Sequence, residues 1–285
     1  MGEFFSVMGP ALAASLVLTA IFVYFGVHIV RRGVIFVDLA LAQVAAMGTT
    51  VAFLVGYPLE GREAYLFSLA FAFLGSVVFT FSRAREEVVP QEAIIGVVYA
   101  FAAAATILLV DKAPHGAEHI KYLLVGNILW VGWGTIRELF AVVFIVGLFH
   151  LLFRHKFSQV SFDAERARAE GISVALWDLL FYLSLAWVVT ASVHTAGVLL
   201  IFSFLIVPAV CGLLLGSGLG MSLWVGWVVG AGVSLLGSLF SYGLDLPTGA
   251  TIICAFGLML LLVAVLKRAI VASKVLGMKA ASAGR

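Results

Sequence analysis

The sequence predicts an all-α membrane protein, a polytopic bundle of about nine transmembrane helices in one domain over residues 1–285. Two compositional observations predict it: 63% of the residues are hydrophobic and only 11% are charged, with a mean hydropathy of +1.16, whereas roughly a quarter of the residues in a soluble domain are charged. The third observation is that apolar runs of about 20 residues recur from Val7 to Leu266 with short polar breaks. These runs lack the alternation of barrel strands, and helices satisfy their own backbone groups in lipid, so the spans are predicted to be helical.

The polar breaks and the Gly/Pro pairs set the expected limits of the spans. We expect spans at about 7–30, 34–56, 64–82, 91–110, 136–153, 173–194, 197–215, 219–241 and 248–266. Only residues 192–197 interrupt the stretch between the sixth and seventh spans, so a single broken helix is an alternative there. In the longer loop at 111–134, Trp130 and Trp133 indicate a helix that lies at the membrane interface.

The distribution of Lys and Arg predicts the orientation, because cytoplasmic loops carry an excess of both residues. If the N-terminus is outside, only Arg62, Lys112, Lys121 and Arg137 of the 17 basic residues fall on the outer side. The expected protein is therefore a multi-pass protein of the cell (inner) membrane. Its C-terminus is cytoplasmic, and the tail from Lys267 is expected to be a frayed helix end. No cluster of basic residues is interleaved with aromatic residues, so a nucleic-acid partner is not expected.

The most polar segment is the inner loop at about 154–171, which reads RHKFSQVSFDAERARAEG. Asp163 suits the N-cap of a short helix over 164–170, where it also lies near the positive end of the helix dipole, and Gly171 suits the end of that helix. A short amphipathic helix on the cytoplasmic face is a natural contact for a soluble partner.

The ionisable residues inside the spans are the first functional candidates, because a charge near the bilayer centre costs at least about 2.5–3.5 kcal/mol on insertion scales. Asp38 lies in the second span, and Gln43 follows five residues later, about 140° further round an ideal helix. Their carboxylate and amide oxygens could both face a hydrophilic pathway. The alternative is that Asp38 reaches the inner interface or pairs with Arg31 or Arg32.

Other polar residues in the spans have structural as well as functional interpretations. Glu92 and Asp178 each lie near the start of a span, where the helix dipole favours an acid, and we interpret both as structural. His194 is a candidate metal ligand or gate, or else an interface residue. Ser203 lies within residues 196–210, whose proline and small residues suit a helix that lines a gated path or, alternatively, one that packs tightly.

The sequence contains no HExxH motif, no nucleophile elbow and no Gly-rich phosphate loop, so we expect this chain neither to hydrolyse nucleotide nor to be an enzyme. The energy for transport would come from a partner or from an ion gradient. Cys211 and Cys254 lie inside apolar runs without CxxC spacing, which is typical of packing residues.

Five stretches of the chain carry a family resemblance. They read VIFVDLALAQVAAMG (34–48), EAIIGVVYAFAAAATILL (92–109), FDAERARAEGI (162–172), GVLLIFSFLIVPA (197–209) and LDLPTGATI (244–252). Together they resemble the permease subunits of bacterial ABC importers for zinc, manganese or iron(II), the ABC-3 type of metal permease. They occur in the family's order and extend from the second span to the last.

The resemblance implies a fold like that of the large (type II-like) ABC importer permeases and import of a divalent cation by alternating access. It implies a homodimer, or a close heterodimer, with two cytoplasmic ABC ATPase subunits and a periplasmic or extracellular solute-binding protein. The metal is then the transported substrate, and no cofactor is bound permanently. The coupling helix that docks on the ATPase would come from the inner loop, with Phe162, Asp163, Ala167 and Gly171 at the matching positions.

One departure from the family concerns the metal. The second-span motif of the family reads Gly-Asp-x-Leu-x-His, whereas this chain has Asp38 at the glycine position and Gln43 at the histidine position. Zinc prefers nitrogen and sulfur ligands, so zinc is less well supported than manganese or iron(II); alternatively, this segment binds no metal. The candidate pathway residues are Asp38, Gln43, His194 and Ser203, with Asp38 as the candidate metal contact.

Two other functions remain as hypotheses. One keeps the ABC architecture but changes the cargo to a chelated metal or a vitamin-like organic molecule. The other is an ion-coupled secondary carrier that uses Asp38 and Glu92 as proton sites. The presence of a partner ATPase would distinguish both ABC hypotheses from the secondary carrier.

Overall fold

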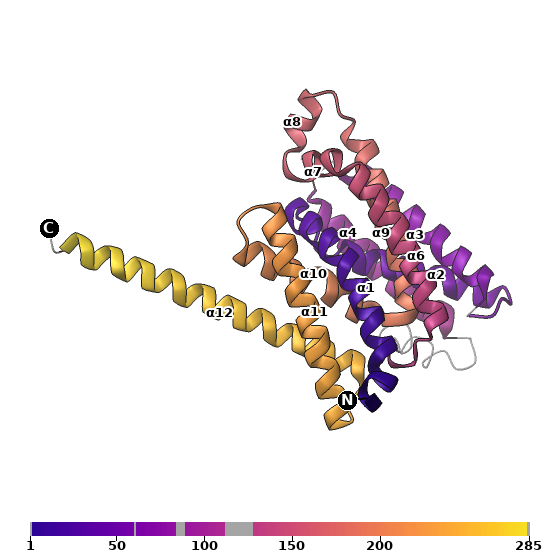
Figure 1. Ribbon diagram of the computed structural model, residues 1–285. Coiled ribbons are helices and arrows are strands. Elements are labelled where there is room, and N and C mark those ends of the chain that lie inside the picture. Colours follow the sequence, from indigo (N-terminus) through magenta and orange to yellow (C-terminus); the bar gives the residue numbers. More distant parts are fainter. Residues whose placement is uncertain (1, 60, 84–88, 112–127, 284–285) are drawn as a thin grey trace.

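All the regular structure in the described part of the chain is helical. The computed structural model describes residues 2–59, 61–83, 89–111 and 128–283, with side chains up to residue 269. Within these ranges, nine helices are long and apolar enough to cross a membrane. They are α1 (Gly2–Arg32), α2 (Val37–Leu54), α3 (Arg62–Arg83), α4 (Gln91–Val110), α6 (Trp133–Leu152), α9 (Val174–Ala196), α10 (Val198–Leu215), α11 (Leu219–Leu244) and α12 (Thr248–Ala283). The prediction of an all-α bundle with nine spans is confirmed (Figure 1).

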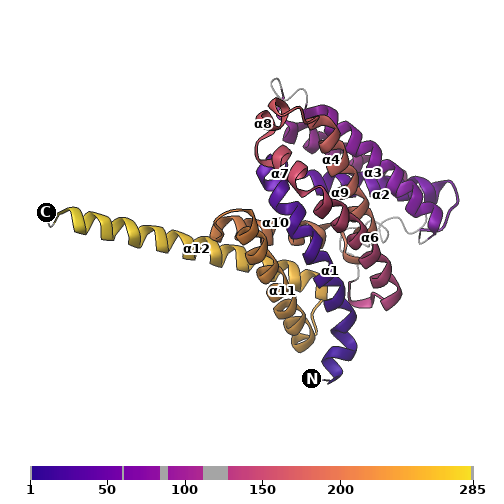
Figure 2. The same cartoon turned by 45° about the horizontal axis from the view of Figure 1, so that its top comes forward.

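Three shorter helices lie between the spans. The inner loop forms α7 (Arg154–Phe162) and α8 (Ala164–Ala169), and a 3-10 helix, η1 (Ile128–Trp130), precedes α6. In both views α7 and α8 lie at the end of the bundle opposite the N-terminus (Figures 1 and 2). The interfacial helix expected within 111–134 falls mostly outside the described residues.

Gly197 separates the sixth span from the seventh. Its φ of +79° is a conformation that residues with a side chain rarely adopt, and its N–H donates to the carbonyl oxygen of Val193 at 2.8 Å. Helix α9 therefore ends at Ala196 and α10 begins at Val198, so the chain forms two helices here.

The last helix is longer than expected. Helix α12 continues through Ala283, beyond the expected end of the span at 266, and projects away from the other helices (Figures 1 and 2). The expectation of a frayed end is therefore wrong for the described part of the tail. The physical reason is composition, because Ala and Lys, which favour helices, are the commonest residues in this segment and no proline interrupts it.

Helices α1, α10 and α11 approach one another closely at glycines. A Cβ atom added at Gly26 of α1 would collide with the carbonyl oxygen of Leu205, and one added at Gly212 of α10 would collide with the carbonyl oxygen of Ser222. A Cβ added at Gly226 of α11 would collide with the Val23 side chain of α1 and would also lie close to the Pro208 carbonyl oxygen of α10. Close backbone approach at small residues is a main source of helix association in membranes. These three helices therefore form one tightly packed unit.

Gly26→Ala should measurably destabilise the protein. The added methyl group meets backbone rather than a flexible side chain, and overpacking of this kind costs about 1–3 kcal/mol. The measurement is the midpoint of thermal unfolding in detergent, with Gly147→Ala of α6 as the matched control, since nothing lies within 4 Å of a Cβ there. Equal midpoints for the two variants would contradict this packing.

A second group of helices surrounds α3. Helix α2 packs against α3 and α4, and α3 packs against α9. The Ser68 hydroxyl of α3 donates to the carbonyl oxygen of Ala45 in α2 at 3.0 Å, and the Ser76 hydroxyl lies 3.0 Å from the carbonyl oxygen of Tyr182 in α9. Hydrogen bonds thus join α3 to both of its neighbours.

Candidate functional site

Asp38 lies in the first turn of α2 and is completely enclosed by the protein. Its relative exposure is 1%, and neither carboxylate oxygen has a hydrogen-bond partner. The alternative pairing with Arg31 or Arg32 is wrong, because neither oxygen of Asp38 has a partner; Arg32 binds Asp178, and Arg31 lies over the ring of Phe162. A buried carboxylate without a partner is costly inside a membrane span, so Asp38 stays a candidate functional residue.

Glu92 approaches the same end of α2 from α4. Its Oε1 accepts a hydrogen bond at 3.0 Å from the backbone N–H of Phe36, the residue at the N-cap of α2, while its Oε2 is buried without a partner. Glu92 therefore has a structural role, as expected, but the hydrogen bond that it accepts stabilises the start of α2 and not the start of its own helix.

The other predicted pathway residues lie on α2, α9 and α10. Gln43 is buried in α2, and His194 is half-buried in the last turn of α9. Ser203 is buried in α10 and donates to the carbonyl oxygen of Leu199 at 2.9 Å. Among the described residues, no three His, Cys, Asp or Glu side chains are grouped to hold a metal ion. The absence of such a group of metal ligands among the described residues is compatible with transport, which requires weak contacts.

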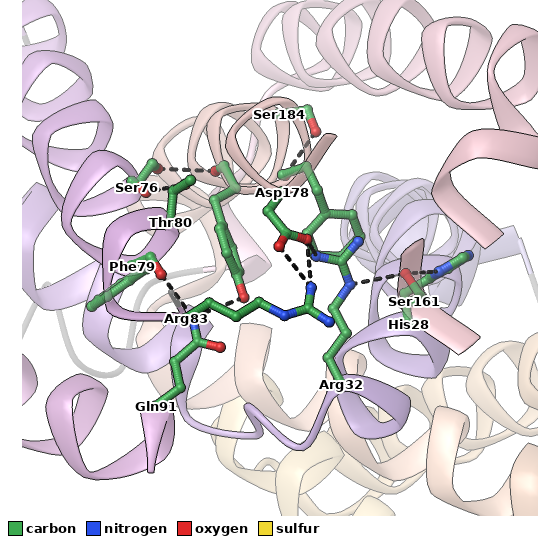
Figure 3. A network of polar contacts seen from close by, with 12 residues as sticks. His28, Arg32, Ser76, Phe79, Thr80, Arg83, Gln91, Ser161, Asp178 and Ser184 are labelled. Carbon is green, nitrogen blue, oxygen red and sulfur yellow. Dashed lines mark hydrogen bonds and ion pairs between the residues drawn. The ribbon is translucent and has the colours of Figure 1, made fainter. Parts of the chain in front are cut away.

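A buried ion-pair cluster joins three spans on the side of α7 and α8 (Figure 3). Arg32 at the end of α1 donates through one terminal nitrogen to Oδ1 of Asp178 in α9 at 2.6 Å. Arg83 at the end of α3 donates through a single nitrogen to both carboxylate oxygens of Asp178, each at 2.7 Å. The Asp178 and Arg32 side chains are each 1% exposed, and Arg83 is 15% exposed. We refer to Arg32, Asp178 and Arg83 as the charge cluster.

The charge cluster continues into α7 through Ser161. The Nε of Arg32 donates to the Ser161 hydroxyl at 2.9 Å, and Nδ1 of His28 lies 2.9 Å from the same oxygen. The guanidinium of Arg32 also lies over the ring of Phe181, 3.8 Å from its centre, which is a cation–π contact. One arginine therefore contacts α7 and α9 from the end of α1.

The second half of the inner loop forms the short helix that the sequence predicts, whereas the sequence does not predict helix α7 in the first half. Asp163 caps α8 by accepting from the backbone N–H of Arg166 at 3.0 Å, and Gly171 ends the segment with a φ of +78°. Phe162 is partly exposed, while Ala167 is fully buried against the start of α9. Outside the spans, the neighbouring Glu170 raises the pKa of Arg166 and so favours its charged form.

A cavity of about 460 Å³ separates α3 from the residues that follow α8. Arg83 and Thr80 of α3 line one side, and residues 171–175 together with Arg168 line another. Asp178 also lines this cavity. The acid of the charge cluster therefore borders this cavity.

Sequence reasoning missed the charge cluster. It treated Asp178 as a first-turn acid and Arg32 and Arg83 as markers of topology. The available signal was the combination of one acid inside a span with single arginines at the ends of two other spans. Because those residues are distant in the sequence, nothing in the chain alone pairs them.

The nine long apolar helices, with ionisable groups buried between them, define a polytopic membrane protein. The chain belongs to the family described as the ABC 3 transport family, whose sequence model matches residues 4–268.

Similar proteins cover nearly the same length. The "Probable iron transport system membrane protein" of Haemophilus influenzae is 27% identical over 249 residues, which are 87% of this chain and 89% of that protein. The manganese import system permease protein ScaB of Streptococcus gordonii is 24% identical and covers 90% of each chain. Among solved structures, PsaBC from Streptococcus pneumoniae in complex with Fab aligns with a TM-score of 0.77 and 22% identity, covering 92% of this chain and 94% of the other. This last similarity concerns the fold.

Proposed function

We propose that this chain is the membrane-spanning permease of an ATP-driven importer for a divalent metal cation. The observation that carries the proposal is Asp38, a buried carboxylate with two unpartnered oxygens in a membrane span. Membership of the ABC 3 transport family supports the mode of transport. The names of the relatives, which refer to iron and to manganese, support the cargo.

The side chains favour manganese or iron(II) over zinc. Asp38 and Gln43 offer oxygen atoms, which suit harder cations, whereas zinc prefers nitrogen and sulfur. His194 and Ser203 remain candidate contacts further along the pathway. Each contact would be brief, since a cation that binds too tightly cannot leave.

The partners follow from the same proposal. Two copies of the permease, or two related chains, form one pathway, with two ATPase subunits on the cytoplasmic face and a solute-binding protein on the outer face. Phe162, Asp163, Ala167 and Gly171 shape the segment that docks on the ATPase. The N-terminus lies outside, and binding and hydrolysis of ATP drive alternating access.

The direct test is metal-dependent ATPase activity. The chain is reconstituted with the ATPase and the solute-binding protein encoded beside it, and zinc, manganese and iron(II) are added in turn. We expect manganese or iron(II) to stimulate hydrolysis and zinc to do so less. An assembled complex that no bare metal stimulates would favour a chelated or organic cargo, and uptake driven by a proton gradient without any ATPase would favour a secondary carrier.

A further inference from the structure

Two consecutive arginines fasten the end of α1 to the inner loop. Arg31 lies over the ring of Phe162, 5.5 Å from its centre, and Arg32 donates from Nε to the adjacent Ser161. Ser161 and Phe162 are the last two residues of α7, and Asp163, which caps α8, follows directly. A displacement of α8 therefore acts on the end of α1 across two side-chain contacts.

The body of α7 is held in place by aromatic contacts. The ring of Phe157 stacks on His150 of α6 with 4.0 Å between centres, and it meets Trp177 of α9 edge-on at 5.2 Å. These contacts connect α7 to the bundle by packing alone. The connection through Ser161 differs, because it is a directional hydrogen bond to a charged group.

From Arg32 the contacts continue to the helix that carries Asp38. Asp178 joins Arg32 to Arg83 of α3. Further along α3, this helix packs against α2: the Ser68 hydroxyl donates to the carbonyl oxygen of Ala45 at 3.0 Å, and Gly75 faces Leu41, leaving room there for no more than a methyl group. Leu41 is one helical turn from Asp38. An unbroken series of contacts thus runs from the inner loop to the candidate pathway.

We propose that Arg32 is a positioning residue that couples movement of the inner loop to movement of α3 and α2, with Ser161 as its contact in the loop. This role rests on the proposed function as a permease driven by an ATPase. Without the link from Arg32 to Ser161, the ATPase still docks and hydrolyses ATP, but a smaller fraction of its cycles moves α3 and α2. The result is uncoupled turnover, with more ATP consumed for each metal ion imported.

The guanidinium of Arg32 is suited to this role because it uses two separate nitrogens. Nε binds Ser161, and a terminal nitrogen binds Asp178. A lysine at this position keeps the charge beside Asp178 but offers one compact ammonium group, which cannot reproduce the planar fork. Arg83 differs, since a single nitrogen makes both of its contacts to Asp178. A lysine can replace Arg83 with less loss.

The test compares four variants of the full complex in proteoliposomes. Arg32→Lys and Ser161→Ala break the link, whereas Arg83→Lys keeps an ion pair with Asp178. Ser192→Ala is the matched control for the serine change, because the buried Ser192 hydroxyl bonds only within its own helix, to the carbonyl oxygen of Val188 at 2.6 Å. The readout is ATP hydrolysed per metal ion imported, a ratio that does not depend on the amount of folded complex.

We expect Arg32→Lys and Ser161→Ala to raise this ratio about fivefold or more, the lower end of typical coupling factors, and Arg83→Lys and Ser192→Ala to leave it near the wild-type value. Unchanged ratios in both Arg32→Lys and Ser161→Ala would overturn the inference. A rise in Ser192→Ala equal to that in Ser161→Ala would also overturn it, since the loss of any buried serine hydroxyl would then have the same effect. A wild-type complex without ATP-dependent import would overturn the proposed function itself, and this role with it.

Discussion

Asp178→Asn is expected to destabilise the protein by about 3–5 kcal/mol, because it leaves two arginines without their shared counter-ion in a buried site. Both guanidinium groups point at this carboxylate, and the exposure of Arg32 is too low for water to replace it. The measurement is the thermal unfolding midpoint of the purified protein in one detergent, with membrane levels as a second readout.

Glu170→Gln is the matched control for this prediction. It breaks the Arg166–Glu170 ion pair of α8, whose side chains are 70% and 40% exposed. Exposed pairs contribute little because water and salt screen them, so the unfolding midpoint should hardly move. Similar shifts for Asp178→Asn and Glu170→Gln would show that burial of the charge cluster does not matter for stability.

Asp38→Asn should separate function from stability. The substitution removes a charge that no hydrogen bond compensates, so the unfolding midpoint should stay the same or rise. Metal uptake should fall at least about tenfold, since even changes in the residues that support metal ligands cost that much. Uptake is measured in proteoliposomes with equal amounts of complex.

Two further variants complete this experiment. Gln43→Ala should lower uptake less than Asp38→Asn, because an amide oxygen is a weaker ligand than a carboxylate. Thr50→Val on the same helix is the control, since the buried Thr50 hydroxyl bonds to Ala46 within α2. Full metal uptake by both the Asp38 and the Gln43 variant would show that neither residue contributes to the pathway.

The sequence predicts the features of this fold that depend on local physics. Apolar runs predict the spans, because lipid leaves helices as the only option for such segments. Asp163 and Gly171 correctly predict the limits of the short helix in the inner loop, since caps depend on neighbouring residues only. Asp38 stands out for the same reason, as an acid where an acid is costly.

Long-range pairing is what the sequence does not reveal. Arg32 and Asp178 are 146 positions apart, and Arg83 and Asp178 are 95 apart. Each residue also has a sufficient local explanation, as an acid in a first turn or as a basic residue at a membrane boundary. The cap that Glu92 supplies to α2 is similar, since acids at helix starts usually serve their own helix.

The uneven burial of the spans bears on how this chain changes over evolutionary time. Helices α1, α2 and α10 are mostly enclosed by protein, whereas α4, α6 and α12 are mostly uncovered. A position that faces lipid tolerates any apolar side chain, so mutations accumulate fastest on these outer helices. A patch on α4, α6 or α12 that changed slowly across many descendants would be an exception. Such a patch would indicate a surface that protein, rather than lipid, covers.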